Sequence, residues 1–196
     1  MTTDPSTAQV RVERDDLVTT LAARLADGWR LALTSARETG DRIRITHLLI
    51  RPVNERLELT VDVPTSDAWV PTLAGVSWAG GRFDREIRDL YGVEPRDHPL
   101  PRRLVRHGHW PTGWYPMRSD AGAVPDFPED VGSYPFVTVA GQGVYEIPVG
   151  PVHAGLIEPG HFRFSVVGET IVRMKARLWF VHRGIEKHFQ GRTPAE

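Results

Sequence analysis

Proline and glycine are concentrated in the middle of this chain, between Val93 and Pro135, and this stretch constrains the fold more than any other feature. Proline fixes φ and lacks an amide donor, so helices and strands cannot run through most of it. Large aromatic side chains argue against a flexible spacer, and the stretch contains Trp110, Trp114, Tyr115 and Phe127. We therefore expect a connector at residues 106–134, pinned along a protein surface, between a domain at 10–105 and a second unit at 135–196.

The first domain has the pattern of an α+β fold, an antiparallel sheet with flanking helices. Apolar residues repeat at helical spacing over residues 13–27, which predicts an amphipathic helix. Alternating apolar and polar residues then predict two strands of a hairpin, at 29–33 and 43–49, joined by a turn at Gly40. A third alternating run, at 57–63, predicts one more strand of the same sheet.

A second amphipathic helix is predicted at residues 79–91, and Gly92 is placed to end it. Its apolar face consists of Phe83, Ile87, Leu90 and Tyr91. Opposite charges lie four residues apart at Asp84 and Arg88, and again at Arg85 and Asp89, so we expect them to pair on the exposed face.

The second unit is predicted to be rich in β-structure and incomplete. Residues alternate in polarity over 162–166 and 172–180, and Gly168 with Glu169 can form the turn between these runs. This pattern predicts a meander that leads into a short helix near Gly184. Few residues remain before Glu196, so we expect the unit to be truncated.

Composition excludes several functions. The formal net charge of −1 provides no global field for nucleic acid or an anionic bilayer. The chain has no cysteine, which excludes disulfides, thiolate zinc sites, cysteine-ligated iron-sulfur clusters and a cysteine nucleophile. A polar start without a secretory signal, and no apolar run of about 20 residues, predict a cytoplasmic protein that does not span a membrane itself.

The second predicted helix and the turn after it carry a recognisable motif. The helix has the sequence Asp84-Arg85-Glu86-Ile87-Arg88-Asp89-Leu90-Tyr91-Gly92, and His98-Pro99 and Arg102-Arg103 follow. This order resembles the C-type (30 kDa) subunit of NADH-quinone oxidoreductase, although Leu100-Pro101 replaces the usual Asp-containing pair. The resemblance implies a cofactor-free module that docks onto a D-type subunit, with Glu86, Asp89, Arg102 and Arg103 as inter-subunit docking candidates. On charge alone, solvated ion pairs on a helix face are the simpler interpretation.

A second motif lies in the predicted β-rich unit. It consists of Gly150-Pro151-Val152-His153-Ala154-Gly155-Leu156-Ile157-Glu158-Pro159-Gly160-His161-Phe162, followed by His182-Arg183-Gly184-Ile185-Glu186-Lys187. These segments resemble the start of the large subunit of energy-converting (group 4) nickel-iron hydrogenases, including formate hydrogenlyase, and of the D-type (49 kDa) subunit. Such hydrogenases often fuse the two modules in this order.

The resemblance implies roles for residues of the second motif. His153 matches a histidine at the quinone pocket of D-type subunits, so it becomes a candidate for a cavity, proton or quinone site. His182, Arg183, Glu186 and Lys187 become candidates for the interface with an iron-sulfur cluster of a neighbouring subunit, where Arg183 would raise the reduction potential of that cluster. A loop histidine bonded to backbone, and helix capping with surface ion pairs, are the structural alternatives.

Three histidines in the proline- and glycine-rich stretch, His98, His107 and His109, could also be metal ligands. Zinc needs three or four convergent ligands with supporting groups, and the spacing matches no such pattern, so we expect surface histidines and no metal site.

The sequence thus predicts part of a membrane-associated hydrogenase or NADH-quinone oxidoreductase-like complex, providing scaffold and interface to its redox centres. We expect no complete active site and no cofactor in this chain, while the resemblance implies a nickel-iron centre and iron-sulfur clusters in the full complex. Expected partners are a hydrogenase small subunit with an iron-sulfur cluster, other complex I-like subunits and a membrane arm that keeps the chain at the inner face of the cell membrane. Two alternatives are a non-catalytic assembly module and a C-type and D-type fusion of a quinone-reducing complex.

Overall fold

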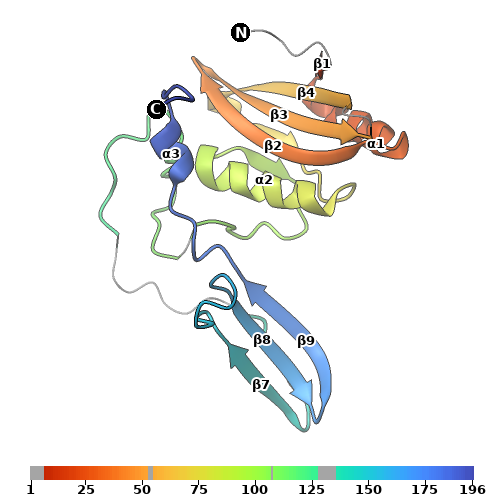
Figure 1. Cartoon of the computed structure of the whole chain (residues 1–196), viewed down its shortest axis with the longest axis vertical. Helices are drawn as coiled ribbons and strands as arrows, with labels where there is room; N and C mark the ends of the chain where they lie inside the picture. Colours follow the sequence, from red (N-terminus) through yellow and green to blue (C-terminus); the bar gives the residue numbers. More distant parts are fainter. Residues whose placement is uncertain (1–6, 53–54, 107, 128–135) are drawn as a thin grey trace. The chain divides into compact units, whose positions relative to one another are not determined.

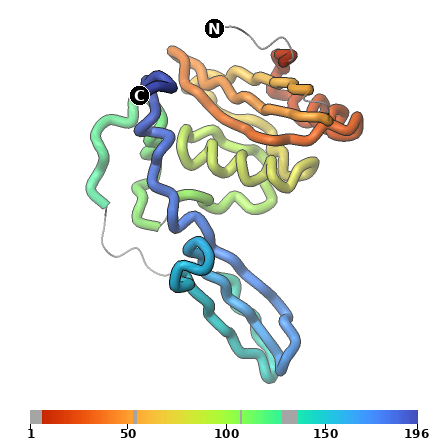
Figure 2. Tube along the Cα trace, viewed as in Figure 1, coloured from red at the N-terminus to blue at the C-terminus, as the bar shows by residue number. Residues whose placement is uncertain are grey.

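The computed structural model describes residues 7–52, 55–106, 108–127 and 136–196. The chain divides into two compact units, Met1–Phe127 and Pro128–Glu196. Each unit has its own sheet, as the cartoon and the chain trace show (Figures 1 and 2). Both sheets contain antiparallel strands accompanied by a few helices, so the fold class is α+β as predicted.

The first unit is built on a four-stranded sheet with the order β1-β4-β3-β2. Its strands are β1 (Thr7–Arg11), β2 (Arg30–Thr39), β3 (Arg42–Arg51) and β4 (Glu55–Pro64). The predicted hairpin and third strand are confirmed, because β2, β3 and β4 pair antiparallel in sequence order. Gly40 has a φ of +60° in the tight turn between β2 and β3, a conformation that glycine adopts without strain.

Helices cover one face of this sheet. The helix α1 (Leu17–Ala26) follows a short 3-10 turn (Arg14–Asp16), and α2 (Trp78–Tyr91) runs along the sheet (Figure 1). Along each strand, every second side chain faces the helices. The inward side chains form the core together with Leu17 and Leu21 of α1 and Ile87 and Leu90 of α2. They are Ile43, Ile45, Leu49, Leu57, Leu59, Val61 and Val63. Both predicted helices are therefore present, with the apolar faces inward.

Three strands were not predicted. The strand β1 pairs in parallel with β4, and β5 (Trp69–Pro71) pairs in parallel with β6 (Glu94–Arg96) on either side of α2 in the sequence. A second 3-10 turn (Thr65–Asp67) leads from β4 toward β5. These strands have three to five residues and pair with distant segments, so local periodicity does not reveal them.

The expected connector is held against the first unit as far as Phe127. Between Asp97 and Phe127 the described residues contain no helix or strand, yet Leu104, Val105 and Met117 are buried. Met117 donates its amide to the carbonyl of Leu90 at 3.2 Å, and the rings of Trp110 and Trp114 lie 5.4 Å apart. These described residues are thus irregular and held against the first unit, of which they form part. The expected domain limits at 105 and 134 stay predictions, and residue 134 lies outside the described residues.

The second unit is a meander of β7 (Val144–Val149), β8 (His161–Val167) and β9 (Thr170–Arg177), followed by the short helix α3 (Ile185–Phe189). The three strands pair antiparallel in the order β7-β8-β9, so the predicted meander and helix are confirmed. Within the part of the chain that the structure describes, no helix combines the length and apolarity needed to cross a membrane.

Candidate functional site

The charged side of α2 binds the backbone of the turn that carries the two arginines. The Oδ2 atom of Asp89 accepts hydrogen bonds from the amides of Leu104, Val105 and Arg106 at 2.7, 3.0 and 3.1 Å. Arg85 donates to the carbonyls of Arg102 and Arg103 at 2.7 and 2.8 Å. Since Asp89 and Arg85 are both buried, these bonds fix the path of the chain after α2.

Three of the four docking candidates, Asp89, Arg102 and Arg103, lie at this turn, and Glu86 lies on α2. Asp89 is buried and occupied by backbone amides, whereas Glu86, Arg102 and Arg103 are half-buried. The guanidinium of Arg103 donates to the carbonyl of Gly108 at 3.1 Å. Asp89 and Arg103 therefore organise their own unit, and a role of the four residues in docking to another subunit stays a prediction.

The expected pairing of Asp84 with Arg88 is wrong. Asp84 is buried and accepts hydrogen bonds from the hydroxyl of Thr72 at 2.8 Å and the amide of Leu73 at 2.7 Å. Arg88 instead lies 3.0 Å from Glu94. Burial raises the pKa of Asp84 to about 6, against the lowering effect of its hydrogen bonds. The spacing suggested an ion pair, but Asp84 shares the inward side of the helix with Ile87.

His153 lies in the loop between β7 and β8, at its narrow neck. Its Nε2 donates to the carbonyl of Gly160 at 2.7 Å, and His161 donates from Nδ1 to the carbonyl of Gly150 at 3.1 Å. The amide of Gly160 also donates to the carbonyl of Pro151. The loop is thus closed by two histidines, while apolar residues at its tip are exposed, with 88% of Leu156 accessible. The assignment of His153 to a cavity or quinone site stays a prediction.

The four interface candidates surround the start of α3. His182 Nε2 lies 2.6 Å from Glu186 Oε1, which ties the segment that precedes α3 to the first turn of the helix. Gly184 has a φ of +67° between them, in the left-handed region. Arg183 and Lys187 are exposed, and Lys187 donates to the side chain of Gln190. The structure therefore brings His182 and Glu186 together and leaves the Arg183 guanidinium at the surface.

The histidines of the proline- and glycine-rich stretch have separate surroundings. His98 is buried, with Nε2 donating to the carbonyl of Gly81 at 2.8 Å and Nδ1 accepting from the amide of Leu100 at 2.9 Å. The ring of His109 meets the edge of Phe127 at 5.4 Å between centroids. His107 lies outside the described residues. Among the residues that are described, no group of three or more histidines, aspartates and glutamates is arranged to hold a metal ion.

The meander of the second unit has two unlike faces, which sequence reasoning missed. Cross-strand neighbours share a face, and one face carries Glu146, Ser165 and Lys175, with Glu146 3.0 Å from the Lys175 ammonium. That hydrogen bond lowers the pKa of Glu146. The other face is apolar, and several of its members are exposed: Tyr145, Ile147, Val149, Ile171 and Met174. The register between strands reveals this division, because the unpaired Val172 shifts the alternation within β9.

The first unit is an α+β domain in which a buried aspartate holds an arginine-bearing turn against a helix. Residues 10–125 match the family described as respiratory-chain NADH dehydrogenase, 30 Kd subunit. The chain belongs to this family.

Relatives extend the similarity to hydrogenases. The chain is 47% identical over 107 residues to hydrogenase-4 component G of Escherichia coli (strain K12), covering 53% of this chain and 19% of that protein. It is 36% identical over 139 residues to formate hydrogenlyase subunit 5 of the same organism, covering 69% of this chain and 24% of that protein. It is 30% identical over 165 residues to the C/D subunit of NADH-quinone oxidoreductase from Phocaeicola vulgatus, covering 74% of this chain and 31% of that protein. The chain thus spans less than a third of the length of each of these relatives.

Proposed function

We propose that the chain acts as a cofactor-free part of a subunit in a membrane-associated hydrogenase or NADH-quinone oxidoreductase-like complex, where it provides scaffold and interface to the redox centres. The similarity to formate hydrogenlyase subunit 5 runs over 139 residues, more than the 127 of the first unit. It therefore extends into the second unit. Support thus comes from both units. The C/D protein of NADH-quinone oxidoreductase names a C part and a D part, and the proposal takes the first unit as C-like and the second as D-like.

The observation that carries the proposal is the uncovered apolar face of the β7–β8–β9 sheet. Met174 is 57% exposed and Ile171 59% exposed on the apolar face of β9. A contiguous apolar patch left exposed on a protein surface marks a site of interaction with other protein. This face fits a sheet that is completed by further protein in an assembly.

The start of α3 provides the proposed interface to a cluster. Arg183 is exposed beside the His182–Glu186 pair, which fixes the backbone on both sides of it. A guanidinium near an iron-sulfur cluster of a neighbouring subunit stabilises the reduced cluster, because it opposes the added negative charge. In this proposal the nickel-iron centre and the clusters belong to other parts of the complex. His153 is the candidate for a cavity wall, and attachment to the inner face of the membrane comes from partner subunits.

Replacement of Arg183 by glutamine in the assembled complex tests this proposal. We expect the reduction potential of the nearest cluster to become more negative, measured by redox titration followed by electron paramagnetic resonance, while the set of proteins in the purified complex stays unchanged. Arg173→Gln removes the same charge from an exposed position on β9 and serves as the control. Equal potentials in Arg183→Gln and the unaltered complex would contradict the role of Arg183 and favour a purely structural module.

A further inference from the structure

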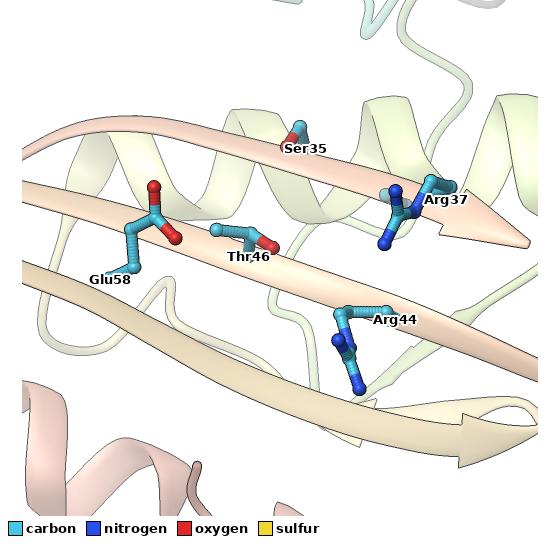
Figure 3. Close-up of a pocket in the computed structure, with 6 residues that line it drawn as sticks. Ser35, Arg37, Arg44, Thr46 and Glu58 are labelled. Atoms are coloured by element: carbon cyan, nitrogen blue, oxygen red, sulfur yellow. The ribbon is translucent and has the colours of Figure 1, made fainter. Parts of the chain in front are cut away.

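The face of the first sheet that points away from α2 carries a shallow depression of about 290 Å³. Figure 3 shows its side chains on this side of β2, β3 and β4, with α2 behind the sheet. Five of the six residues that line it are polar or charged: Ser35, Ala36, Arg37, Arg44, Thr46 and Glu58 make up the lining.

Two arginines lie directly opposite each other at this depression. Arg37 of β2 pairs with Arg44 of β3 in the register of the sheet. Like charges directly opposite across strands are destabilising, so the fold alone gives no reason for this pair. Figure 3 shows the Arg37 guanidinium at the β2–β3 side of the depression and that of Arg44 toward β4.

Only one of the two arginines has an acidic partner among the described residues. Arg44 donates to both carboxylate oxygens of Asp62, at 2.8 and 2.9 Å, and this contact holds the pKa of Asp62 below its usual value. Arg11 lies 3.6 Å from the same carboxylate, which is therefore shared between two cations. Within the described ranges, no carboxylate, carbonyl or aromatic ring contacts the guanidinium of Arg37.

The remaining groups also favour an anion. The hydroxyls of Ser35 and Thr46 lie on opposite strands beside the arginine pair and can donate hydrogen bonds. Glu58 is the one acidic residue of the lining, and its Oε2 accepts a hydrogen bond from the Gln9 amide at 2.8 Å. Arg42, two residues before Arg44, adds a further cation to the same face of β3.

We propose that this depression is a docking site for an acidic segment of a protein partner, with one carboxylate of the segment placed between Arg37 and Arg44. The planar guanidinium matches a carboxylate with two parallel hydrogen bonds. With the carboxylate bound, negative and positive groups would alternate across the sheet in the order Asp62, Arg44, bound carboxylate, Arg37. A protein segment is favoured over a lipid surface because β1 to β4 contain no lysine, tryptophan or phenylalanine, the types that accompany arginine in membrane-binding faces.

The test uses the full chain labelled with nitrogen-15 and three probes: a hexaglutamate peptide, inorganic phosphate and phosphatidylglycerol vesicles. We expect the peptide to shift the amide signals of Ser35, Arg37 and Thr46, with binding that weakens as salt is added. Arg37→Gln should weaken peptide binding roughly fivefold, as loss of one exposed charge-assisted contact implies. The control Arg173→Gln removes the same charge from the second unit and should bind the peptide as the unaltered chain does.

Several results would overturn this proposal. These are no shift at the depression with the peptide, an equal loss of affinity in Arg37→Gln and Arg173→Gln, or phosphate binding as tightly as the peptide. Binding of the vesicles through Arg37 would replace the acidic segment by a lipid surface. Because Arg37 lies outside the core, an unchanged amide spectrum outside β2 and β3 verifies that the variant is folded.

Discussion

Asp89→Ala should lower the free energy of unfolding of the first unit by about 3 to 5 kcal/mol, because it leaves buried donors without an acceptor. One carboxylate oxygen accepts three backbone amides, from Leu104, Val105 and Arg106. Urea unfolding followed by tryptophan fluorescence measures the effect, since Trp110 and Trp114 lie in the segment that this turn begins.

Two further variants separate the roles of charge and hydrogen bonding at Asp89. Asp89→Asn keeps one acceptor oxygen for the three amides but removes the negative charge, so its loss of stability should lie between those of the wild type and alanine. Asp120→Ala removes an exposed aspartate that pairs with Arg118 at 2.8 Å and should cost less than about 1 kcal/mol. Similar losses in Asp89→Ala and Asp120→Ala would show that the turn is not anchored as described.

The second large effect concerns pH, through His47 in the core. His47 is 1% exposed, its Nδ1 lies 3.1 Å from the Thr34 hydroxyl, and its Nε2 is buried without a hydrogen-bond partner. Burial lowers its pKa from 6.5 to about 4. Between pH 6.5 and about pH 4, the unfolded chain binds a proton at His47 that the folded chain does not. The free energy of unfolding therefore decreases as the pH falls through this interval. The total loss from His47 is about 3 kcal/mol.

Asp84 has the opposite pH dependence over nearly the same interval. Its pKa rises from 3.8 to about 6 on folding, so between these values the folded chain binds the extra proton and stability increases as the pH falls. We therefore expect a shallow net dependence in the wild type. His47→Leu should remove the loss and leave a first unit whose stability rises as the pH falls from about 6 to about 4. Urea unfolding at several pH values tests this, and an identical slope in His47→Leu and the wild type would contradict the assignment.

Local sequence patterns predicted the parts of the fold that depend on neighbouring residues. The alternation in β2, β3 and β4 and the helical periodicity of α2 are set by which side chains face the core, so they are visible in a single segment. The strand β1 could not be predicted in this way, because its pairing with β4 joins residues about 50 positions apart and its exposed side chains show no clear alternation.

The sequence predicted which residues belong to the candidate site, but not all of their hydrogen-bond partners. Spacing alone indicated i,i+4 ion pairs on α2, but the backbone amides of Leu73 and of Leu104 to Arg106 provide donors that approach Asp84 and Asp89 from distant segments. A hydrogen bond from a backbone amide to a buried carboxylate is charge-assisted, so tertiary contacts fix Asp84 where helical spacing alone indicated a pair with Arg88. The His182–Glu186 pair could be anticipated, because the two residues are four apart at the start of a helix.

Hydrogen exchange of the β7–β8–β9 amides tests most directly whether the second unit is completed by an assembly. In the isolated chain, we expect these amides to exchange much faster than those of β3 and β4, whose strands contribute to a buried core. In the purified complex, exchange in β7, β8 and β9 should slow by about tenfold or more, as coverage of the apolar face stabilises the sheet. Exchange in the isolated chain as slow as in β3 and β4, or unchanged on assembly, would contradict the proposed role.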